Sequence, residues 1–168
     1  MVECIQIRTA CEGDAEAIID GLKMNAEHLS LCEKVTVTVE DILRHGFGPS
    51  PAFHALIAEQ RGVFAGLCIF LDTFSTWTGR RGAYIQDLVV DPRFRGYGVG
   101  QQLLRHTIKQ VVEKGGHYLR LSVDAQNQSA QTFYEKFGFV WCQEERIYAL
   151  RGDAFLSSEG IIIGKEEE

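Results

Sequence analysis

Three glycines of this chain, Gly96, Gly98 and Gly100, alternate with other residues between an apolar segment and an amphipathic one. Glycine lets the backbone approach a ligand closely, and a helix that begins there offers unpaired N–H groups and the positive end of its dipole. This arrangement predicts a site for an anionic group such as a diphosphate. A tight strand-to-helix turn with no ligand is the alternative that the glycines alone leave open.

The spacing of these glycines differs from that of two better-known nucleotide loops. The chain has no G-x-x-x-x-G-K-[ST] segment, and its glycines do not form G-x-G-x-x-G at the start of a first strand–helix–strand unit. Sites for nucleoside triphosphates and for NAD are therefore not favoured.

The hydrophobic pattern predicts a strand before the glycine loop and a helix after it. Residues 83–90 predict a strand that ends at Asp91 and Pro92, because proline cannot continue a central strand. Residues 98–113 place apolar side chains at helical spacing, and Gly115 and Gly116 follow them.

The remaining segments extend this unit to a complete order of elements. Further strands are expected over residues 2–8, 53–59, 63–70, 118–123, 139–142 and 146–150. Further helices are expected over 14–29, over a short segment that follows Thr38 as N-cap and ends at Gly46, and over 129–137, before Gly138. This order predicts an α/β chain with a mixed sheet covered by helices on both faces.

Composition narrows the classes of function. With 168 residues, 45% hydrophobic and 24% charged, the chain suits one compact domain with its own core. The net charge of −6 argues against a nucleic-acid partner. It favours cationic small substrates, and the alternative is an acidic surface that only keeps the protein soluble. No apolar run is long enough to cross a bilayer and the first residues do not form a secretory signal, so a cytoplasmic protein without a membrane role is expected.

The five cysteines are scattered and form no C-x-x-C pair or zinc-ligand spacing. They are expected to be reduced thiols that mostly pack in the interior, and no metal site is expected. The cysteines are Cys4, Cys11, Cys32, Cys68 and Cys142.

The segment Arg95 to Gly100 also matches the pattern [Q/R]-x-x-G-x-[G/A], and through it the chain resembles the GNAT superfamily of N-acetyltransferases. The resemblance is to the branch that contains spermidine/spermine acetyltransferases and enzymes acting on thialysine and related diamines. The segments that carry it, besides the loop, are 41–48, 53–59, 74–79, 84–90, 127–134 and 138–139.

This resemblance implies a fold and a reaction. The whole chain, residues 1–168, would be a single GNAT domain whose twisted, mostly antiparallel sheet of about seven strands is flanked by about four helices. It would transfer the acetyl group of acetyl-CoA, its cosubstrate, to a primary amine of a small diamine, polyamine or amino-acid-like molecule. The transfer would be a direct attack in a ternary complex, without a metal, and the protein would form a homodimer.

By the same resemblance, the backbone of residues 88–90 would pair with the pantetheine arm of acetyl-CoA, and the loop would hold its pyrophosphate. Asn127 and Ala130 would contact the lower pantetheine, and the Tyr134 phenol would protonate the departing thiolate. An alternative for Tyr134 is a purely structural position in the core. The cosubstrate residues are thus Leu88, Val89, Val90, Arg95, Gly96, Tyr97, Gly98, Val99, Gly100, Gln101, Asn127, Ala130 and Tyr134.

Two positions depart from the branch's pattern. Gln86 stands where a glutamate is usual, and glutamine cannot accept a proton, so the base would be Asp87, Glu145, a water chain or solvent. His28 and Leu29 stand where polyamine enzymes tend to have Tyr-Glu. Both changes remove a carboxylate from the amine pocket, which argues against spermine as the natural substrate.

The candidate substrate-binding residues have structural alternatives. His28 could be a substrate contact or a partly exposed helix residue, and Trp77 could wall the acceptor pocket or cover the sheet edge. Asp72 and Asp87 could line the amine site, or Asp87 could bond only to neighbouring backbone. The candidates are His28, Trp77, Gln86, Asp87 and Glu145.

Two other functions stay open at this point. One is an acetyltransferase for protein lysines or N-termini, and the other is a non-catalytic acetyl-CoA-binding module, which the missing glutamate at Gln86 makes conceivable. Acetylation of peptides would identify the first, and cofactor binding without turnover the second.

Overall fold

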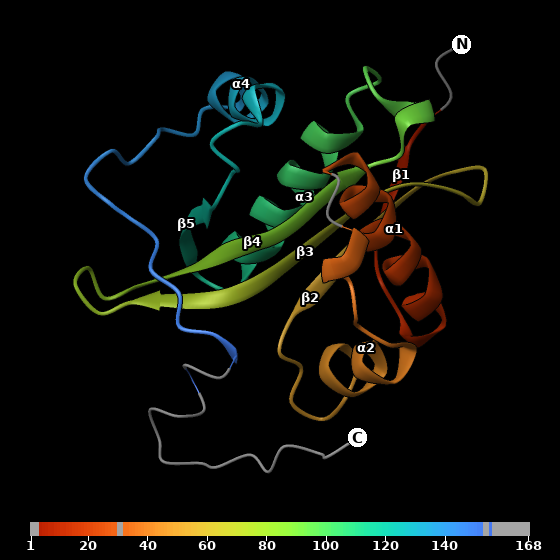
Figure 1. Cartoon of the computed structure of the whole chain (residues 1–168), viewed down its shortest axis with the longest axis horizontal. Helices are drawn as coiled ribbons and strands as arrows, with labels where there is room; N and C mark the ends of the chain where they lie inside the picture. Colours follow the sequence, from red (N-terminus) through yellow and green to blue (C-terminus); the bar gives the residue numbers. More distant parts are fainter. Residues whose placement is uncertain (1–3, 30–31, 153–154, 156–168) are drawn as a thin grey trace, which may run out of the picture. The chain divides into compact units, whose positions relative to one another are not determined.

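The computed structural model describes residues 4–29, 32–152 and 155 (Figure 1). The described residues up to Gln126 form one compact unit, and those from Asn127 onward form a second. Residues 2 and 3 of the first predicted strand and the side chain of Cys32 lie outside the described part.

The first unit is built on one sheet of five strands in the order β1-β2-β3-β4-β5. Neighbours from β1 to β4 are antiparallel, and β4 and β5 are parallel. The strands are β1 (Gln6–Thr9), β2 (His54–Gln60), β3 (Val63–Ser75), β4 (Arg80–Val90) and β5 (Gly116–Leu121). The prediction of a mixed, mostly antiparallel sheet is confirmed.

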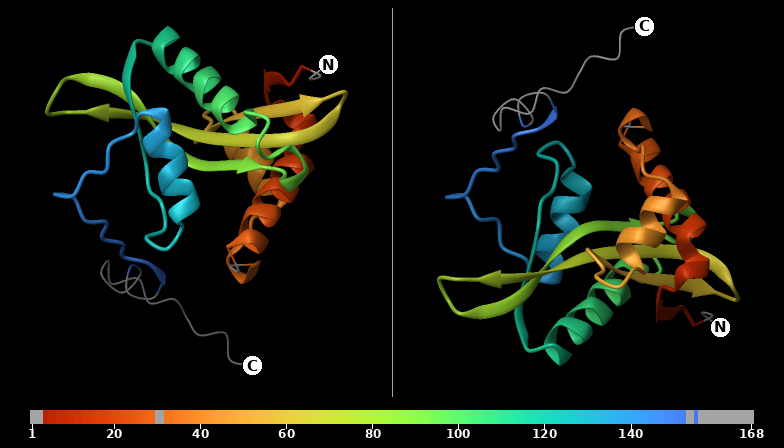
Figure 2. Two further views of the ribbon diagram at one scale, coloured as in Figure 1. Left: turned by 90° about the horizontal axis from the view of Figure 1, so that it is seen from above. Right: turned by 90° about the horizontal axis from the view of Figure 1, so that it is seen from below.

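Helices cover both faces of this sheet, as Figure 2 shows. Helices α1 (Ala15–His28) and α2 (Val39–Gly46) lie on one face, and α3 (Val99–Glu113) lies on the other. On the first face, Ile18 and Ile42 pack with Leu67 and Ile69 in a buried core. The predicted helices over 14–29, 39–46 and 98–113 are thereby confirmed within a residue or two.

Local sequence explains where α2 begins. The Thr38 hydroxyl accepts a hydrogen bond from the Asp41 backbone N–H at 3.2 Å, and the Asp41 carboxylate accepts one from the Thr38 N–H at 3.0 Å. This reciprocal capping satisfies two backbone donors at a helix start that otherwise have no partner. The carboxylate also lies in the first turn, where the helix dipole stabilises negative charge.

The hairpin of β3 and β4 is longer than its sequence pattern indicated. The ladder continues to the pair Ser75 and Arg80, so both strands extend beyond the expected bounds of 63–70 and 83–90, and only a short turn joins them. Polar residues such as Thr73 can belong to this part of the ladder because an antiparallel pair of strands needs only one apolar face.

The second unit begins with α4 (Gln128–Phe137), which confirms the helix predicted over 129–137. The helix ends at Gly138, whose φ of 115° few other residues adopt. The strands predicted over 139–142 and 146–150 are wrong, since no strand is present between Gly138 and Gly152. Their alternating pattern suits a strand, but a strand also needs a neighbouring strand to pair with, and within the described residues no strand pairs with either segment.

Candidate acetyl-CoA and amine site

The glycine loop lies between β4 and α3 and has an open backbone. Gly96 and Gly98 have φ values of 82° and 77°, in the left-handed region that favours glycine. A Cβ at either position would have no atom within 4 Å, so the space above the loop is free of side chains. Gly98 is the N-cap of α3 and provides no side-chain cap, which leaves the first N–H groups of this 15-residue helix without a side-chain acceptor.

The base of the loop is held by a carboxylate that sequence reasoning missed. The buried Asp91 side chain accepts hydrogen bonds from the Arg93 backbone N–H at 2.9 Å and from its guanidinium at 2.6 Å. These contacts hold the pKa of Asp91 below its usual range. The Asp-Pro-x-x-Arg start of the loop could have signalled this turn, because aspartate readily accepts from the N–H two residues on.

The loop residues differ in exposure. Val99 and Gly100 are buried against the sheet, whereas Tyr97 and Gln101 are exposed. The Arg95 guanidinium donates to the Val90 carbonyl oxygen at 3.4 Å and folds back over the end of β4. The loop therefore presents backbone groups at its centre, with Tyr97 and Arg95 beside them.

The edge of β4 that leads into the loop is free. Pairing of β4 with β5 ends at Ile85 and Leu121, and the Tyr84 hydroxyl donates to the Ser122 hydroxyl at 2.8 Å near that end. Beyond it, no strand of the described residues pairs with Leu88, Val89 or Val90 on this side. An extended ligand with amide groups can hydrogen-bond to such an edge as a further strand does.

A β-bulge lies where β4 leaves β5. The β3–β4 register places Asp87 opposite Ile69 and Ile85 opposite Phe70, so Gln86 is the extra residue. Bulges bend a strand and change the direction of its side chains, and they often occur near active sites. Gln86 is exposed at this bend, and Asp87 follows it as a half-buried side chain.

Asp87, at the bulge, is a carboxylate without a bonded partner among the described residues. Burial raises its pKa above the ordinary aspartate value. Within residues 4–29, 32–152 and 155, no group forms a hydrogen bond or ion pair with it. No unpartnered side-chain oxygen there is fully enclosed either, so the Asp87 oxygens still reach solvent. A cation that enters this region would find an unneutralised carboxylate.

The remaining substrate-binding candidates of the first unit have other surroundings than Asp87. Trp77 lies in the β3–β4 turn, nine residues before Gln86, and the part of β4 from Arg80 to Gln86 alone spans roughly 20 Å. Asp72 pairs with the Lys114 ammonium at 3.0 Å and with His54 at 3.1 Å. His28 is an exposed residue that ends α1. In this chain Asp72 is therefore already neutralised by its neighbours.

In the second unit, three predicted residues share one face of α4. The Asn127 side chain accepts from the Ala130 backbone N–H at 3.0 Å and caps the helix, and Tyr134 follows Ala130 by four residues. The Tyr134 ring makes edge contacts with Phe133 at 5.2 Å and Phe139 at 5.5 Å between ring centroids. Glu145 lies beyond the helix, exposed in the extended segment.

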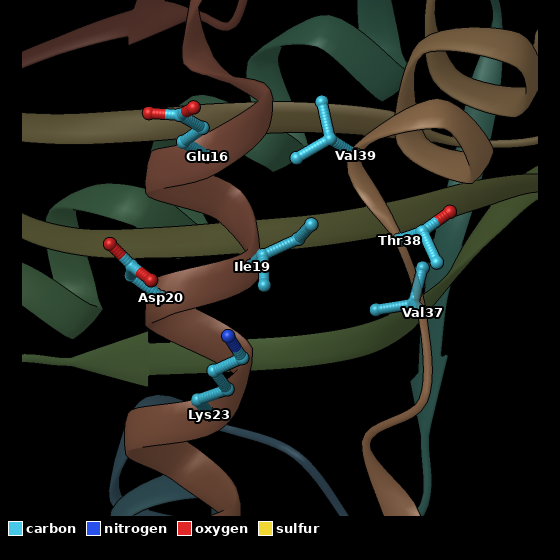
Figure 3. A pocket seen from close by; sticks show the side chains of 7 residues that line it. All are labelled: Glu16, Ile19, Asp20, Lys23, Val37, Thr38 and Val39. Carbon is cyan, nitrogen blue, oxygen red and sulfur yellow. The ribbon is translucent and has the colours of Figure 1, made fainter.

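A hollow of about 300 Å³ lies between α1 and the start of α2 and was not foreseen from the sequence (Figure 3). Figure 3 shows Ile19 directed toward Val39 across it. No residue of the glycine loop or of β4 lines it. Its lining residues are Glu16, Ile19, Asp20, Lys23, Val37, Thr38 and Val39.

Comparison with known proteins identifies the family. The sequence profile of the acetyltransferase (GNAT) family matches residues 24–139. The chain is 32% identical over 142 residues to the thialysine N-epsilon-acetyltransferase of Sus scrofa, an alignment that covers 80% of this chain and 83% of that protein. The chain belongs to the acetyltransferase (GNAT) family. It is an acetyl-transferring enzyme by this membership.

This acetyltransferase is also similar to a second sequence relative and to a solved structure. It is 27% identical over 144 residues to the spermidine/spermine N(1)-acetyltransferase-like protein 1 of Homo sapiens, which covers 82% of this chain and 21% of that longer protein. An aminoglycoside acetyltransferase from an uncultured soil metagenomic sample, solved with sisomicin, superposes with a TM-score of 0.75 at 18% identity. That superposition covers 88% of this chain and 97% of the other. It shows that the GNAT fold is shared.

GNAT acetyltransferases use acetyl-CoA, and the first unit suits this cosubstrate. The open left-handed glycines and the uncapped start of α3 match the needs of a pyrophosphate, and the free edge of β4 matches those of an amide-containing arm. Among the described residues, no cluster of three or more His, Cys, Asp or Glu could hold a metal ion. None of the helices searched there has the length and hydropathy of a membrane span.

Proposed function

We propose that this acetyltransferase transfers the acetyl group of acetyl-CoA to a primary amine of a small cationic molecule, such as a diamine or an amino-acid-like amine, by direct attack in a ternary complex. One observation carries the proposal. Asp87, an unneutralised carboxylate, lies at the bulge where the free edge of β4 begins, and this edge leads into the glycine loop. The relatives named for thialysine and for spermidine and spermine support the same class of substrate.

Each part of the cosubstrate would have its own protein partner. The backbone of residues 88–90 would hydrogen-bond to the amides of the pantetheine arm, which otherwise lose water without replacement. The loop from Arg95 to Gly100, with Gln101, would hold the pyrophosphate through backbone N–H groups and the α3 dipole. When bound, acetyl-CoA supplies a thioester that is activated toward attack by an amine.

The residues of α4 would act at the thioester end. Asn127 and Ala130 would lie along the lower pantetheine, and the Tyr134 phenol would donate its proton to the departing sulfur. The edge contacts of the Tyr134 ring with Phe133 and Phe139 limit its rotation and support this assignment.

The acceptor amine enters as an ammonium ion because primary aliphatic amines are protonated at neutral pH. Asp87 would attract it, and the negative net charge of −6 would favour its approach over the surface. Gln86 at the bulge and Glu145 in the second unit would add polar contacts, and His28 and Trp77 would contribute if the acceptor is long enough to reach them.

The proposal takes residues 1–168 as one acetyltransferase domain. In support of this, the family match runs from residue 24 to residue 139 and spans the junction between Gln126 and Asn127. A match that continues across this junction supports the proposal that both units belong to one domain.

The test is release of CoA thiol from acetyl-CoA with a panel of acceptors. The panel contains spermidine, spermine, short diamines, lysine, thialysine-like amino acids, aminoglycosides and a histone-like peptide. Saturable release with one small amine is expected. Release with the peptide alone would favour a protein acetyltransferase, and acetyl-CoA binding without release across the panel would favour a non-catalytic module.

We also propose that the protein is a homodimer. The segment after α4 exposes Val140, Trp141, Ile147, Tyr148 and Leu150, and an apolar surface of this kind is usually covered by a partner. Light scattering at micromolar concentration is expected to give twice the chain mass of 18.8 kDa. Replacement of Trp141 and Ile147 by serine should shift the mass to the monomer value, and a monomeric wild-type protein would refute the proposal.

A further inference from the structure

The departure at Gln86 leaves the reaction without its usual proton acceptor, and three aspartates of the described structure are already held by cations. Asp14 is bound by the Arg8 guanidinium at 2.7 Å, Asp91 by Arg93 and Asp72 by Lys114 and His54. In each of these the pKa is lowered. A carboxylate held by a cation is a weak base, so these three are unsuited to remove a proton.

Asp87 has the opposite surroundings. Its cross-strand neighbour is Ile69, which belongs to the core cluster that packs under α1, so its stem is enclosed by apolar groups. Its oxygens reach solvent at the point where β4 separates from β5. The enclosure raises the pKa of the carboxyl, which makes it a better base.

No other charge near Asp87 accounts for this behaviour. Helix α1 packs against β4, yet no charged group on it or elsewhere in the described residues shifts the pKa of Asp87. On β3 the ionisable neighbour is Cys68. Burial and the Asp87 charge, opposed by a hydrogen bond from Thr107, raise the pKa of this thiol to about 12, so it stays neutral.

We propose that Asp87, rather than a residue at position 86, is the proton acceptor of the reaction. This inference rests on the proposed function. The ammonium of the acceptor gives one N–H proton to an Asp87 oxygen, and the neutral amine that results attacks the thioester carbonyl. The new C–N bond forms as the C–S bond breaks. The attacking nitrogen loses its second N–H proton to water, and the leaving thiolate takes up one proton from the Tyr134 hydroxyl, which water then reprotonates. Asp87 returns its proton to water, so that one proton is released in the net reaction.

The decisive variant is Asp87→Asn, which keeps the shape of the side chain and removes the base. At pH 7 its kcat/KM with the best amine should fall about 100-fold or more, because proton removal would depend on the small fraction of free amine. The deficit should shrink as the pH approaches the pKa of the amine. The acid limb of the wild-type profile of kcat/KM against pH should vanish. Glu113→Gln, at an exposed helix position, is the matched control and should keep the wild-type profile.

Thermal stability gives a readout that does not depend on turnover. A pKa that is raised by folding means that the ionised form of Asp87 lowers the free energy of unfolding. This loss is absent below the pKa of the unfolded state and is complete once the pH passes the pKa of the folded state. Asp87→Asn should therefore raise the Tm by about 1 to 3 °C at pH 7 and by less at pH 4. A structural role would predict a lower Tm instead.

The outcomes separate this inference from the proposed function. A wild-type protein that binds acetyl-CoA and releases no thiol with any amine counts against the proposed function. Asp87→Asn that melts at or below the wild-type temperature at pH 7 counts against Asp87, whether or not turnover is found. A raised KM with unchanged kcat, or loss of the acid limb in Glu145→Gln in place of Asp87→Asn, also overturns the inference.

Discussion

At the residue scale, the Tyr134 ring packs against its neighbours without using its hydroxyl group. The ring contacts Phe133 and Phe139 edge-on, and these contacts do not need the oxygen. Tyr134→Phe should therefore keep the fold and the acetyl-CoA affinity while kcat falls about 10- to 100-fold, because the departing thiolate would lose its proton donor.

Steady-state kinetics and acetyl-CoA titration by calorimetry check this expectation. Tyr148→Phe, which removes the same oxygen from a side chain that is 87% exposed, is the matched control and should leave kcat unchanged. If Tyr134→Phe turns over at the wild-type rate, the hydroxyl is not the acid.

At the element scale, the start of α3 is the proposed binding site for the pyrophosphate, and a carboxylate placed there should prevent anion binding. Gly98→Glu introduces both a charge and a side chain at a residue with φ of 77°. Acetyl-CoA affinity should fall at least about 100-fold, since repulsion at the pyrophosphate and loss of its hydrogen bonds act together.

The backbone strain of that substitution needs its own control. Gly62 in the β2–β3 turn has φ of 73° and an equally open surrounding, so Gly62→Glu imposes similar strain away from the loop. It should lower the Tm by a similar amount and leave acetyl-CoA affinity intact. Equal loss of affinity in both variants would mean that Gly98→Glu acts by unfolding.

The elements differ in how far their sequence determined them. Thr38 and Gly46 bounded α2 because capping and termination depend on residues nearby in the chain. The strands expected over 139–142 and 146–150 failed because strand formation depends on a neighbour that alternation of side chains does not reveal. The bulge at Gln86 was equally invisible, since register is set by the partner strand, and with it the burial of Asp87. The glycine turn between β4 and α3 could be predicted from residue spacing, whereas the carboxylate that stays unneutralised could not.

At the scale of the whole molecule, one ionic cluster ties the N-terminal strand to the rest of the first unit. Arg8 on β1 binds Asp14 through both of its terminal nitrogens and also binds Glu59 on β2. Hydrogen bonding from Arg8 is the main reason that the pKa of Asp14 lies far below its usual range. The cluster closes β1 against β2 and the start of α1.

The sign of its pH dependence follows from the lowered pKa. A depressed folded pKa contributes stability above the unfolded value, about 3.9 for aspartate, and that stability is lost as the pH falls toward the folded value. Asp14→Asn should therefore lower the free energy of unfolding by about 2 kcal/mol at pH 7, and by less at pH 2.5. Urea denaturation at both pH values checks this, and an equal loss at both would exclude the ionic explanation.

The positions of Trp77 and Trp141 have a consequence for spectroscopy. These are the two tryptophans of the chain, and they are 98% and 74% exposed. Indole emission of the native monomer should already lie near that of tryptophan in water, so its wavelength will report little of the melting of the core. The same property makes the fluorophore useful in another way. If a second copy covers Trp141, emission should shift to shorter wavelength as concentration rises, and Trp77→Phe would assign that shift to Trp141 alone.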